Sequence, residues 1–158
     1  MKEIPLTRGK VALVDDEDFE QLFQFQWYAD LIRGRWYVMR IAGLRGRKRR
    51  IYMHRDILGI PLGVEVDHKD GNGLNNQRYN LRPATHAQNL QNRGKPSSNT
   101  SGYKGVSWFK RDGKWRACIG VDGRVIHLGY YDTAEEAARA YNEAAPKYHG
   151  KFAKLNEI

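Results

Sequence analysis

Residues 93–102, RGKPSSNTSG, contain no apolar side chain, although the stretches on both sides of them do. Glycine, proline, serine and asparagine favour turns and loops, so a segment of this composition is typical of a linker. It divides the 158-residue chain into a first module over 1–93 and a second over 102–158, joined by a linker over 94–101. Each module is shorter than about a hundred residues, so each builds its own small core.

The second module has the pattern of a three-stranded antiparallel sheet followed by one helix. Its strand candidates are residues 103–109, 114–121 and 124–131. Asp112-Gly113 and Asp122-Gly123 separate them, and Asp-Gly is a strong hairpin signal. Thr133, with Glu136 three residues later, predicts a capped helix start. Alanines on one face of this helix predict packing against the sheet, and Pro146 is expected to end it.

Alternation along these strands sorts their side chains between the two faces of the sheet. Ala117 and its neighbours two residues away fall on the side that the alanine face of the helix can cover. Arg116 and Cys118 then face away from the helix, as does His127 on the third strand. The exposed face of this sheet is therefore expected to carry polar and basic groups.

Composition limits the classes of partner. Lys and Arg number 27 against 18 acidic residues, which gives a net charge of +9 and a pI near 9.7. A chain this basic favours a polyanion, most often nucleic acid. No apolar run approaches the ~18 residues of a membrane helix, and the N-terminus lacks a signal-peptide pattern. Cys118 is the only cysteine, which excludes an internal disulfide and a zinc site built on several cysteines. We expect an intracellular protein with no membrane partner.

A basic run interrupts the first module between strand candidates at 36–39 and 51–53. Five of the six residues at 45–50 are basic, and we interpret the run as a hairpin tip. It is either a solvated turn or a clamp on DNA phosphates, and in a basic two-module chain we favour the clamp. Its candidate DNA-binding residues are Arg45, Arg47, Lys48, Arg49 and Arg50.

Residues 64–92 carry the chemistry-bearing pattern. Asp67 and His68 stand at the end of an alternating strand pattern, and a glycine-rich turn follows them. A second strand begins near Asn80, and Asn89 lies one turn into a helix whose start is predicted by a Thr-x-x-Gln capping box. The expected order is strand, turn, strand, helix, with four polar side chains at defined points.

These four side chains suit phosphodiester hydrolysis. Asp67 and Asn89 offer oxygen ligands for a hard cation such as Mg²⁺. His68 is a candidate general base because imidazole titrates near neutral pH, and the Asn80 amide oxygen is a candidate for fixing its tautomer. Neighbours on a regular strand point to opposite faces, so Asp67 and His68 share one site only if the strand bends there.

Five short segments of this module resemble the HNH nucleases. They are His54-Arg55, Val66-Asp67-His68-Lys69-Asp70-Gly71-Asn72, Asn75-Asn76, Asn80-Leu81-Arg82 and Thr85-His86-Ala87-Gln88-Asn89. The closest branch is that of phage and bacterial homing endonucleases, which have the ββα-metal fold. The resemblance implies that His68 is the general base, that Asn80 orients it, and that Asp67 and Asn89 bind Mg²⁺ or Mn²⁺. Asn89 replaces the final His of the family name, and His86 is a second-rank alternative. The resemblance also implies the cytoplasm of a bacterial or phage-infected cell.

The second module resembles the plant ethylene-response-factor (APETALA type) DNA-binding domain, on words such as Tyr103-Lys104-Gly105-Val106 and His127-Leu128-Gly129-Tyr130-Tyr131. That family lays its sheet in the major groove of double-stranded DNA. The implied DNA contacts are Lys104, Trp108, Lys110, Arg111, Arg116, Arg124 and His127. Cys118 and His127 replace residues that plant members present to bases, so base preference is not carried over. Trp108 is either core or stacking material, and His54 either contacts a DNA phosphate from the strand feeding the site or packs as a structural histidine.

Together these patterns predict an α+β protein with an N-terminal ββα-metal nuclease module and a C-terminal sheet-and-helix DNA-binding module. The leading hypothesis is a metal-dependent, homing-type DNA endonuclease. The alternative is a non-catalytic DNA-binding regulator on a degenerate nuclease scaffold, against which the intact set of four polar residues weighs. An RNA-directed protein ranks last, because the expected outward faces are basic rather than aromatic. Nothing in the sequence indicates an obligate protein partner.

Overall fold

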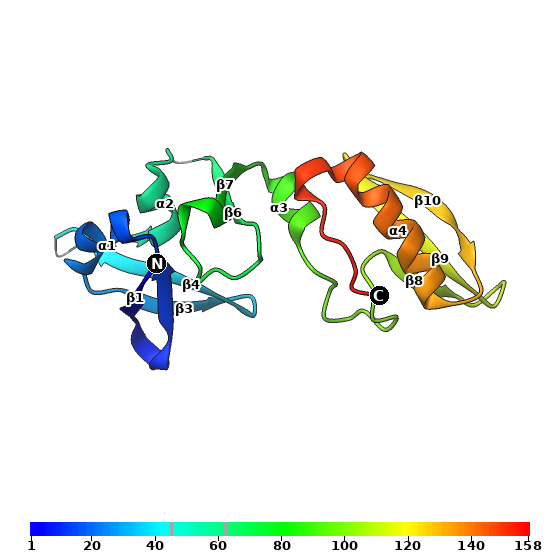
Figure 1. The fold of residues 1–158 in the computed structure, drawn as a ribbon, viewed down its shortest axis with the longest axis horizontal. Helices are drawn as coiled ribbons and strands as arrows, with labels where there is room; N and C mark the ends of the chain where they lie inside the picture. Colours follow the sequence, from blue (N-terminus) through cyan, green and yellow to red (C-terminus); the bar gives the residue numbers. More distant parts are fainter. Residues whose placement is uncertain (45, 62) are drawn as a thin grey trace. The chain divides into compact units, whose positions relative to one another are not determined.

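A computed structural model describes residues 1–44, 46–61 and 63–158. The chain forms two compact units, Met1–Thr85 and His86–Ile158. It is a mixed α+β protein, and in the described residues the strands pair antiparallel within four small sheets (Figure 1). Within the described ranges, no helix is long and apolar enough to cross a membrane.

The first unit consists of two hairpins and a three-stranded sheet with short helices between them. Its elements are β1 (Lys2–Pro5), a 3₁₀ turn (Thr7–Gly9), β2 (Val11–Val14), α1 (Asp16–Phe23), β3 (Tyr28–Ile32), β4 (Arg35–Ala42), β5 (Arg49–Tyr52), α2 (Met53–Leu58), β6 (Glu65–His68), a 3₁₀ turn (Arg78–Asn80) and β7 (Leu81–Ala84). β1 pairs with β2, β3-β4-β5 form one sheet, and β6 pairs with β7. The predicted hairpin around the basic run is confirmed, with Ala42 opposite Arg49.

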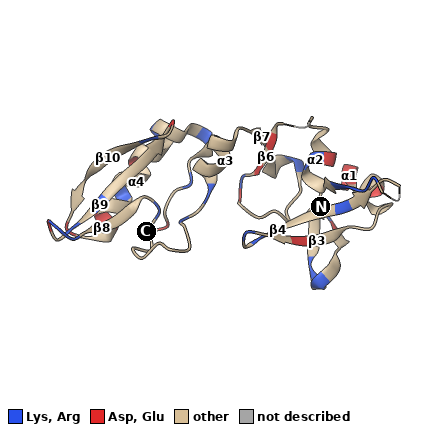
Figure 2. Ribbon diagram, turned by 180° about the vertical axis from the view of Figure 1, so that it is seen from behind, with Lys and Arg blue, Asp and Glu red and all other residues tan. Residues whose placement is uncertain are grey.

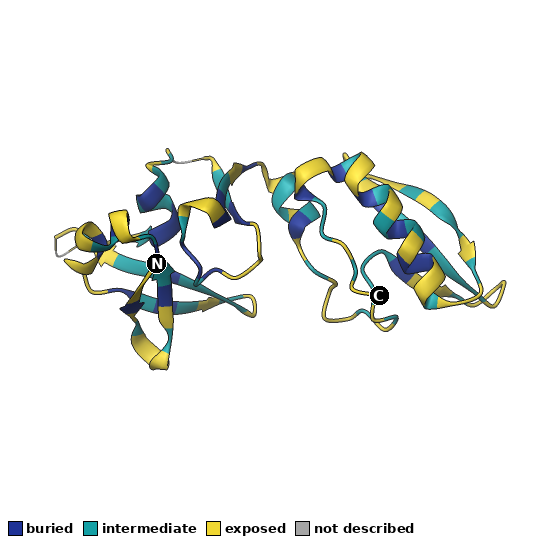
Figure 3. Cartoon of the chain, viewed as in Figure 1, coloured by how far each residue is buried: buried dark blue, intermediate teal, exposed yellow. Residues whose placement is uncertain are grey.

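One apolar cluster holds this unit together and supports the strands that carry the polar site. Trp27, Val38 and Met53 are buried in it with residues of β1, β2 and α1, and Figure 3 shows this buried interior in dark blue. The indole nitrogen of Trp27 donates to the Leu22 carbonyl at 2.8 Å, so the one polar atom of this large side chain is paired.

The acidic start of α1 ties the N-terminal hairpin to the segment before β7. Arg78 donates to both carboxylate oxygens of Asp18, at 2.8 and 2.7 Å, and Asp18 is buried. The Asp15 carboxylate accepts from the Arg78 backbone N–H at 2.7 Å and from the Gln77 amide at 3.1 Å. A charge-assisted network of this kind holds the approach to β7 in place.

The second unit confirms the predicted sheet and helix. Its elements are α3 (His86–Asn92), β8 (Val106–Phe109), β9 (Lys114–Val121), β10 (Arg124–Tyr131), α4 (Ala134–His149) and a 3₁₀ turn (Gly150–Phe152). The strand order is β10-β9-β8. Thr133 and Glu136 form the predicted capping box. Ala117 packs against Ala137 and Ala138 of α4, as the alternation predicted.

The prediction that Pro146 ends the helix after the three-stranded sheet is wrong, because α4 continues to His149. Proline removes one helical hydrogen bond, but the following turn is held by packing. Ala145 is fully buried against β9 residues, and His149 Nε2 bonds the Gly120 carbonyl at 2.8 Å. Burial of this last turn offsets the missing bond.

One element boundary differs from that expected, because Met53 begins helix α2 rather than ending a strand. The compact units divide between Thr85 and His86, because α3 packs against the 3₁₀ turn Gly150–Phe152 of the second unit. The linker over 94–101 stays a prediction from composition.

Candidate functional site

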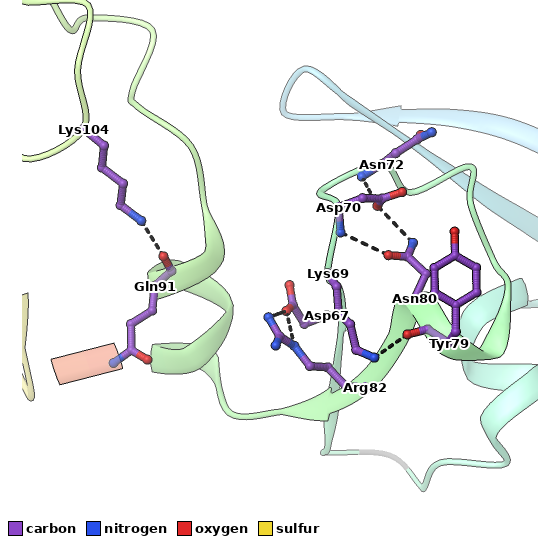
Figure 4. A network of polar contacts seen from close by, with 9 residues as sticks. All are labelled: Asp67, Lys69, Asp70, Asn72, Tyr79, Asn80, Arg82, Gln91 and Lys104. Carbon is purple, nitrogen blue, oxygen red and sulfur yellow. Dashed lines mark hydrogen bonds and ion pairs between the residues drawn. The ribbon is translucent and has the colours of Figure 1, made fainter. Parts of the chain in front are cut away.

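The β6–β7 hairpin presents Asp67 and His68 at the end of β6. Asp67 pairs across the hairpin with Arg82, and His68 pairs with Leu81. Arg82 Nε and Nη2 lie 2.7 and 2.6 Å from Asp67 Oδ2 (Figure 4). Both Asp67 and His68 are about 95% buried, at 6% and 5% exposure, so the carboxylate is held with its counter-charge in a largely dry setting.

His68 is held by groups from three other segments. Its Nε2 lies 3.3 Å from Asn76 Oδ1. Its ring meets His54 edge to face, with centroids 5.1 Å apart, and meets Tyr37 at 6.1 Å. Because an amide oxygen only accepts, Nε2 carries the proton in this pair and Nδ1 is the basic nitrogen. Burial lowers the pKa of His68 below its usual value, which favours the neutral imidazole.

Asn80 is placed differently from the expectation that it orients His68. Its amide oxygen accepts from the Asp70 backbone at 3.0 Å, and its Nδ2 donates to Asp70 Oδ1 at 2.9 Å and to the Asn75 carbonyl at 2.8 Å. Asn80 therefore holds the turn that follows β6 (Figure 4). The bond to the His68 ring comes from Asn76, which sequence reasoning did not select.

The sequence analysis assigned no individual role to Asp70, Asn75 or Asn76, and it did not pair Arg82 with Asp67. Asp70 accepts from the Asn72 backbone at 2.8 Å and, through its second oxygen, from Asn75 Nδ2 at 2.8 Å. Asn76 is fully buried and also donates to the Leu74 carbonyl at 3.2 Å. A cluster of Asp, Asn and Gly after a strand signals such a side-chain-stapled turn, but it does not reveal which amide reaches the histidine.

His54 does not lie on a strand feeding the site, as one interpretation had it. It occupies the first turn of α2 and is 8% exposed, so it is a packed histidine, and its contact with a DNA phosphate stays a prediction from the sequence. Its ring stacks on Tyr52 with centroids 5.6 Å apart. Nδ1 of His54 is buried without a hydrogen-bond partner in the described part of the chain. Burial, and next the nearby His68, lower its pKa to about 3.

This pKa predicts acid sensitivity of the first unit. The pKa of His54 is about 3 in the folded chain, against an ordinary value of 6.5. As pH falls, the unfolded chain therefore binds a proton at His54 at a higher pH than the folded chain does. Stability from this group is complete above pH 6.5 and is lost as pH falls toward 3. At pH 5 the free energy of unfolding should be about 2 kcal/mol lower than at pH 7.5. His54→Gln should flatten this dependence, as measured by hydrogen exchange of first-unit amides; an unchanged pH dependence would contradict the assignment.

The donor chemistry fits a hard cation. Asp67 offers a buried carboxylate at the end of β6, and Mg²⁺ is typically bound through one or two carboxylates, with water and substrate phosphate completing its shell. Residues 1–44, 46–61 and 63–158 contain no cluster of three or more His, Cys, Asp or Glu that could hold a metal ion. Asn89 and His86 lie on α3 in the second unit, so their ligand roles stay predictions from the sequence.

Residues 46–48 of the basic run lie between β4 and β5, and Arg49 and Arg50 begin β5. Arg45 lies outside the described residues. Arg47, Lys48, Arg49 and Arg50 are exposed. Arg50 comes within 3.8 Å of Asp30 on β3, a long contact that leaves the guanidinium available to a solvent-side anion. Figure 2 shows Lys and Arg positions, in blue, along the ribbons of both units.

The outer face of the second sheet is basic and aromatic. Arg116 and His127 lie on it as predicted, and Phe109 and Tyr130 join them. The Tyr130 ring lies 4.4 Å from His127 and 5.1 Å from Phe109 between centroids. A register shift between His127 and Gly129 brings Tyr130 opposite Arg116. Simple alternation misses this, although a glycine inside a strand is a signal for such a bulge.

Four other candidate DNA contacts fall into two groups. Lys110, Arg111 and Arg124 are exposed in or beside the two hairpin turns. Trp108 pairs across the sheet with Trp115, and their rings meet at 5.1 Å. Because Trp115 packs on the core under α4, Trp108 lies on the helix side of the sheet, 47% exposed.

The Lys104 side chain forms a hydrogen bond within the second unit. Its ammonium donates to the main-chain carbonyl of Gln91 on α3 (Figure 4). Burial, and next the charge of Lys154, lower its pKa to about 8. Lys104 is therefore directed at a main-chain acceptor of its own unit, whereas Arg111 pairs with the neighbouring Asp112 carboxylate at the exposed hairpin turn.

Comparison with known proteins identifies two regions. A family model of HNH endonucleases matches residues 54–91, and the AP2 domain matches residues 101–151. Protein 3.8 of Escherichia phage T7 is 40% identical over 96 residues, which cover 61% of this chain and 78% of that protein. A mimivirus protein named uncharacterized HNH endonuclease L560 (Acanthamoeba polyphaga mimivirus) is 32% identical over 151 residues, 96% of this chain and 77% of that protein.

The second region also resembles plant proteins. The AP2-like ethylene-responsive transcription factor TOE2 of Arabidopsis thaliana is 37% identical over 88 residues. This match covers 56% of the chain but only 18% of the plant protein. No solved structure matches the chain.

Proposed function

This chain belongs to the HNH endonuclease family, and on that premise we propose that it is a metal-dependent endonuclease that hydrolyses phosphodiester bonds of double-stranded DNA. The AP2 domain is proposed to bind the duplex beside the cleavage position. The observation that carries the proposal is the buried His68 at the end of β6, with Nε2 bonded to Asn76 at 3.3 Å. A neutral imidazole held in one tautomer has a nitrogen that can accept a proton, which is what a general base needs.

In the proposed reaction, His68 Nδ1 takes the proton of the water that attacks phosphorus, while the bond from phosphorus to the leaving sugar oxygen breaks and that oxygen takes a proton from solvent. Asn76 keeps Nε2 protonated and the ring oriented, while the His54 and Tyr37 rings limit its rotation. Asp67 and Asn89 are the proposed oxygen ligands of Mg²⁺ or Mn²⁺, which when bound would neutralise charge developing on the phosphate. Arg82 orients the Asp67 carboxylate.

Asn80 is proposed to act indirectly. Its hydrogen bonds to Asp70 and Asn75 hold the turn from which Asn76 reaches His68. We further propose, from the sequence resemblance, a homing-type nuclease that acts in the cytoplasm of a bacterial or phage-infected cell.

Incubation of supercoiled plasmid DNA with the full chain tests this function. With Mg²⁺ we expect nicked or linear products, and we expect none with a chelator. Binding without cleavage across Mg²⁺, Mn²⁺ and several plasmid sequences would overturn the nuclease proposal. The chain would then be a DNA-binding regulator on a nuclease scaffold.

The AP2 domain is expected to bind DNA largely through phosphate contacts. Lys110→Ala and Arg124→Ala remove exposed charges beside the two hairpin turns. Each should weaken binding to unrelated duplexes by a similar factor and reduce the slope of log K against log salt by about one. Titrations at several salt concentrations measure this slope, and an unchanged slope would remove either residue from the DNA interface.

A further inference from the structure

A chain of polar contacts runs through the second unit from α4 to α3. Asn142 of α4 exchanges two bonds with the Asn156 backbone, at 2.9 and 2.7 Å. The Asn156 side chain in turn brackets the Lys104 backbone, accepting from its N–H at 2.7 Å and donating to its carbonyl at 3.1 Å. Lys104 then donates its ammonium to the Gln91 carbonyl. The backbone of Lys104 is thus fixed on both sides, and its side chain is aimed at α3.

Gln91 occupies the last turn of α3, which ends at Asn92. The last four carbonyls of a helix lack an intrahelical partner and form the negative end of the helix dipole. A lysine ammonium is therefore a favourable cap for this helix end. The cost is visible in the pKa of Lys104, which burial and Lys154 lower to about 8. A cation kept at a partly buried position needs such an acceptor.

This contact joins the two regions that the family comparisons separate. The HNH match ends at Gln91, and the AP2 match begins at residue 101. Both Gln91 and Lys104 lie in the same compact unit, where α3 also packs against the 3₁₀ turn Gly150–Phe152. The last helix of the nuclease motif is thus built partly on the DNA-binding domain.

We propose that Lys104 is a positioning residue of the nuclease, which caps α3 and fixes the helix that carries Asn89, rather than a DNA contact. The consequence for cleavage rests on the proposed function, because only that assigns Asn89 to the metal. The capping itself does not depend on it. The AP2 domain then has two tasks, since it binds DNA with its outer sheet face and supports the nuclease helix with the segment before β8.

Hydrogen exchange of the full-length chain without metal tests the cap. Lys104→Met keeps the aliphatic stem and removes the donor, and Lys110→Met is the matched control on an exposed lysine of the same unit. We expect α3 amides to exchange about tenfold faster in Lys104→Met, as for loss of a charged hydrogen bond, with β9 and β10 unchanged. Lys104→Arg should restore protection, and Lys110→Met should leave α3 unaffected. Unchanged α3 exchange, or equal acceleration across the sheet, would overturn the proposal.

DNA measurements separate this role from phosphate binding. In a chelator, Lys104→Met should bind duplex DNA with the native affinity and salt slope, whereas Lys110→Met should weaken both. At saturating DNA with Mg²⁺, Lys104→Met should cleave about tenfold more slowly, because α3 is less well fixed. A reduced salt slope in Lys104→Met would make Lys104 a DNA contact and overturn the proposal. If the native chain does not cleave, the proposed function fails, while the exchange experiment still decides the cap.

Discussion

Replacement of His68 with alanine is expected to slow single-turnover DNA cleavage by about 10²–10⁴-fold, which is the usual contribution of a general base. The imidazole is the only group at the end of β6 that we assign to proton removal, and it is held for that task by Asn76. Duplex affinity in a chelator should stay within about twofold of native, because His68 is 5% exposed and DNA binding is assigned to other surfaces. Rates are measured by quenched cleavage of a labelled duplex at saturating protein.

Asn76→Ala serves as the companion variant. It removes the bond that sets the tautomer of His68, so the cleavage rate should fall by a smaller factor, about 10–100-fold. Nitrogen NMR of the His68 ring should show Nε2 protonated in the native chain and a mixture of tautomers in the variant. Native cleavage by His68→Ala would remove His68 from the catalytic role.

The second large effect is expected from loss of the ion pair between Asp67 and Arg82. Arg82→Met leaves the Asp67 carboxylate without the cation at 2.6 Å, and the side chains of Asp67 and Arg82 are only 7% and 11% exposed. Removing one partner of a buried pair typically costs about 3–5 kcal/mol. Hydrogen exchange of the β6 and β7 amides measures the loss within the first unit. Arg50→Met is the control, because Arg50 is 64% exposed and lies 3.8 Å from Asp30, so this long contact should contribute less than about 1 kcal/mol.

The double variant Asp67→Asn with Arg82→Met completes this test. Removal of both charges should cost less than Arg82→Met alone, because no buried charge is then left without its partner. Additive losses would show that the two side chains do not stabilise each other, and the proposed orienting role of Arg82 would fail.

Local signals predicted the second domain well. Asp-Gly turns at Asp112-Gly113 and Asp122-Gly123 bracket the middle strand, and the Thr133 box determines where α4 begins. Signals of this kind depend on residues within a few positions of one another. Pro146 misled the same reasoning, since the packing of Ala145 against distant strand residues is not visible in a local pattern.

In the first domain, local signals located the site but did not determine the contacts within it. The pattern around Asp67 and His68 located the site, because the strand and turn signals lie beside those residues. It did not select Asn76 over Asn80, since several asparagines follow the turn and only the folded backbone determines which one reaches the ring. Arg82 was missed as the partner of Asp67, because cross-strand register follows from the length of the intervening turn.

The most direct test of the central claim is the origin of the new oxygen in the cleaved DNA. A single turnover of the native chain in H₂¹⁸O with Mg²⁺ produces terminal phosphates whose mass can be measured. If water activated by His68 attacks phosphorus, each terminal phosphate should contain one ¹⁸O atom, and His68→Ala should yield almost no product in the same time. Product phosphate without ¹⁸O, or a covalent protein–DNA species, would contradict hydrolysis by an activated water.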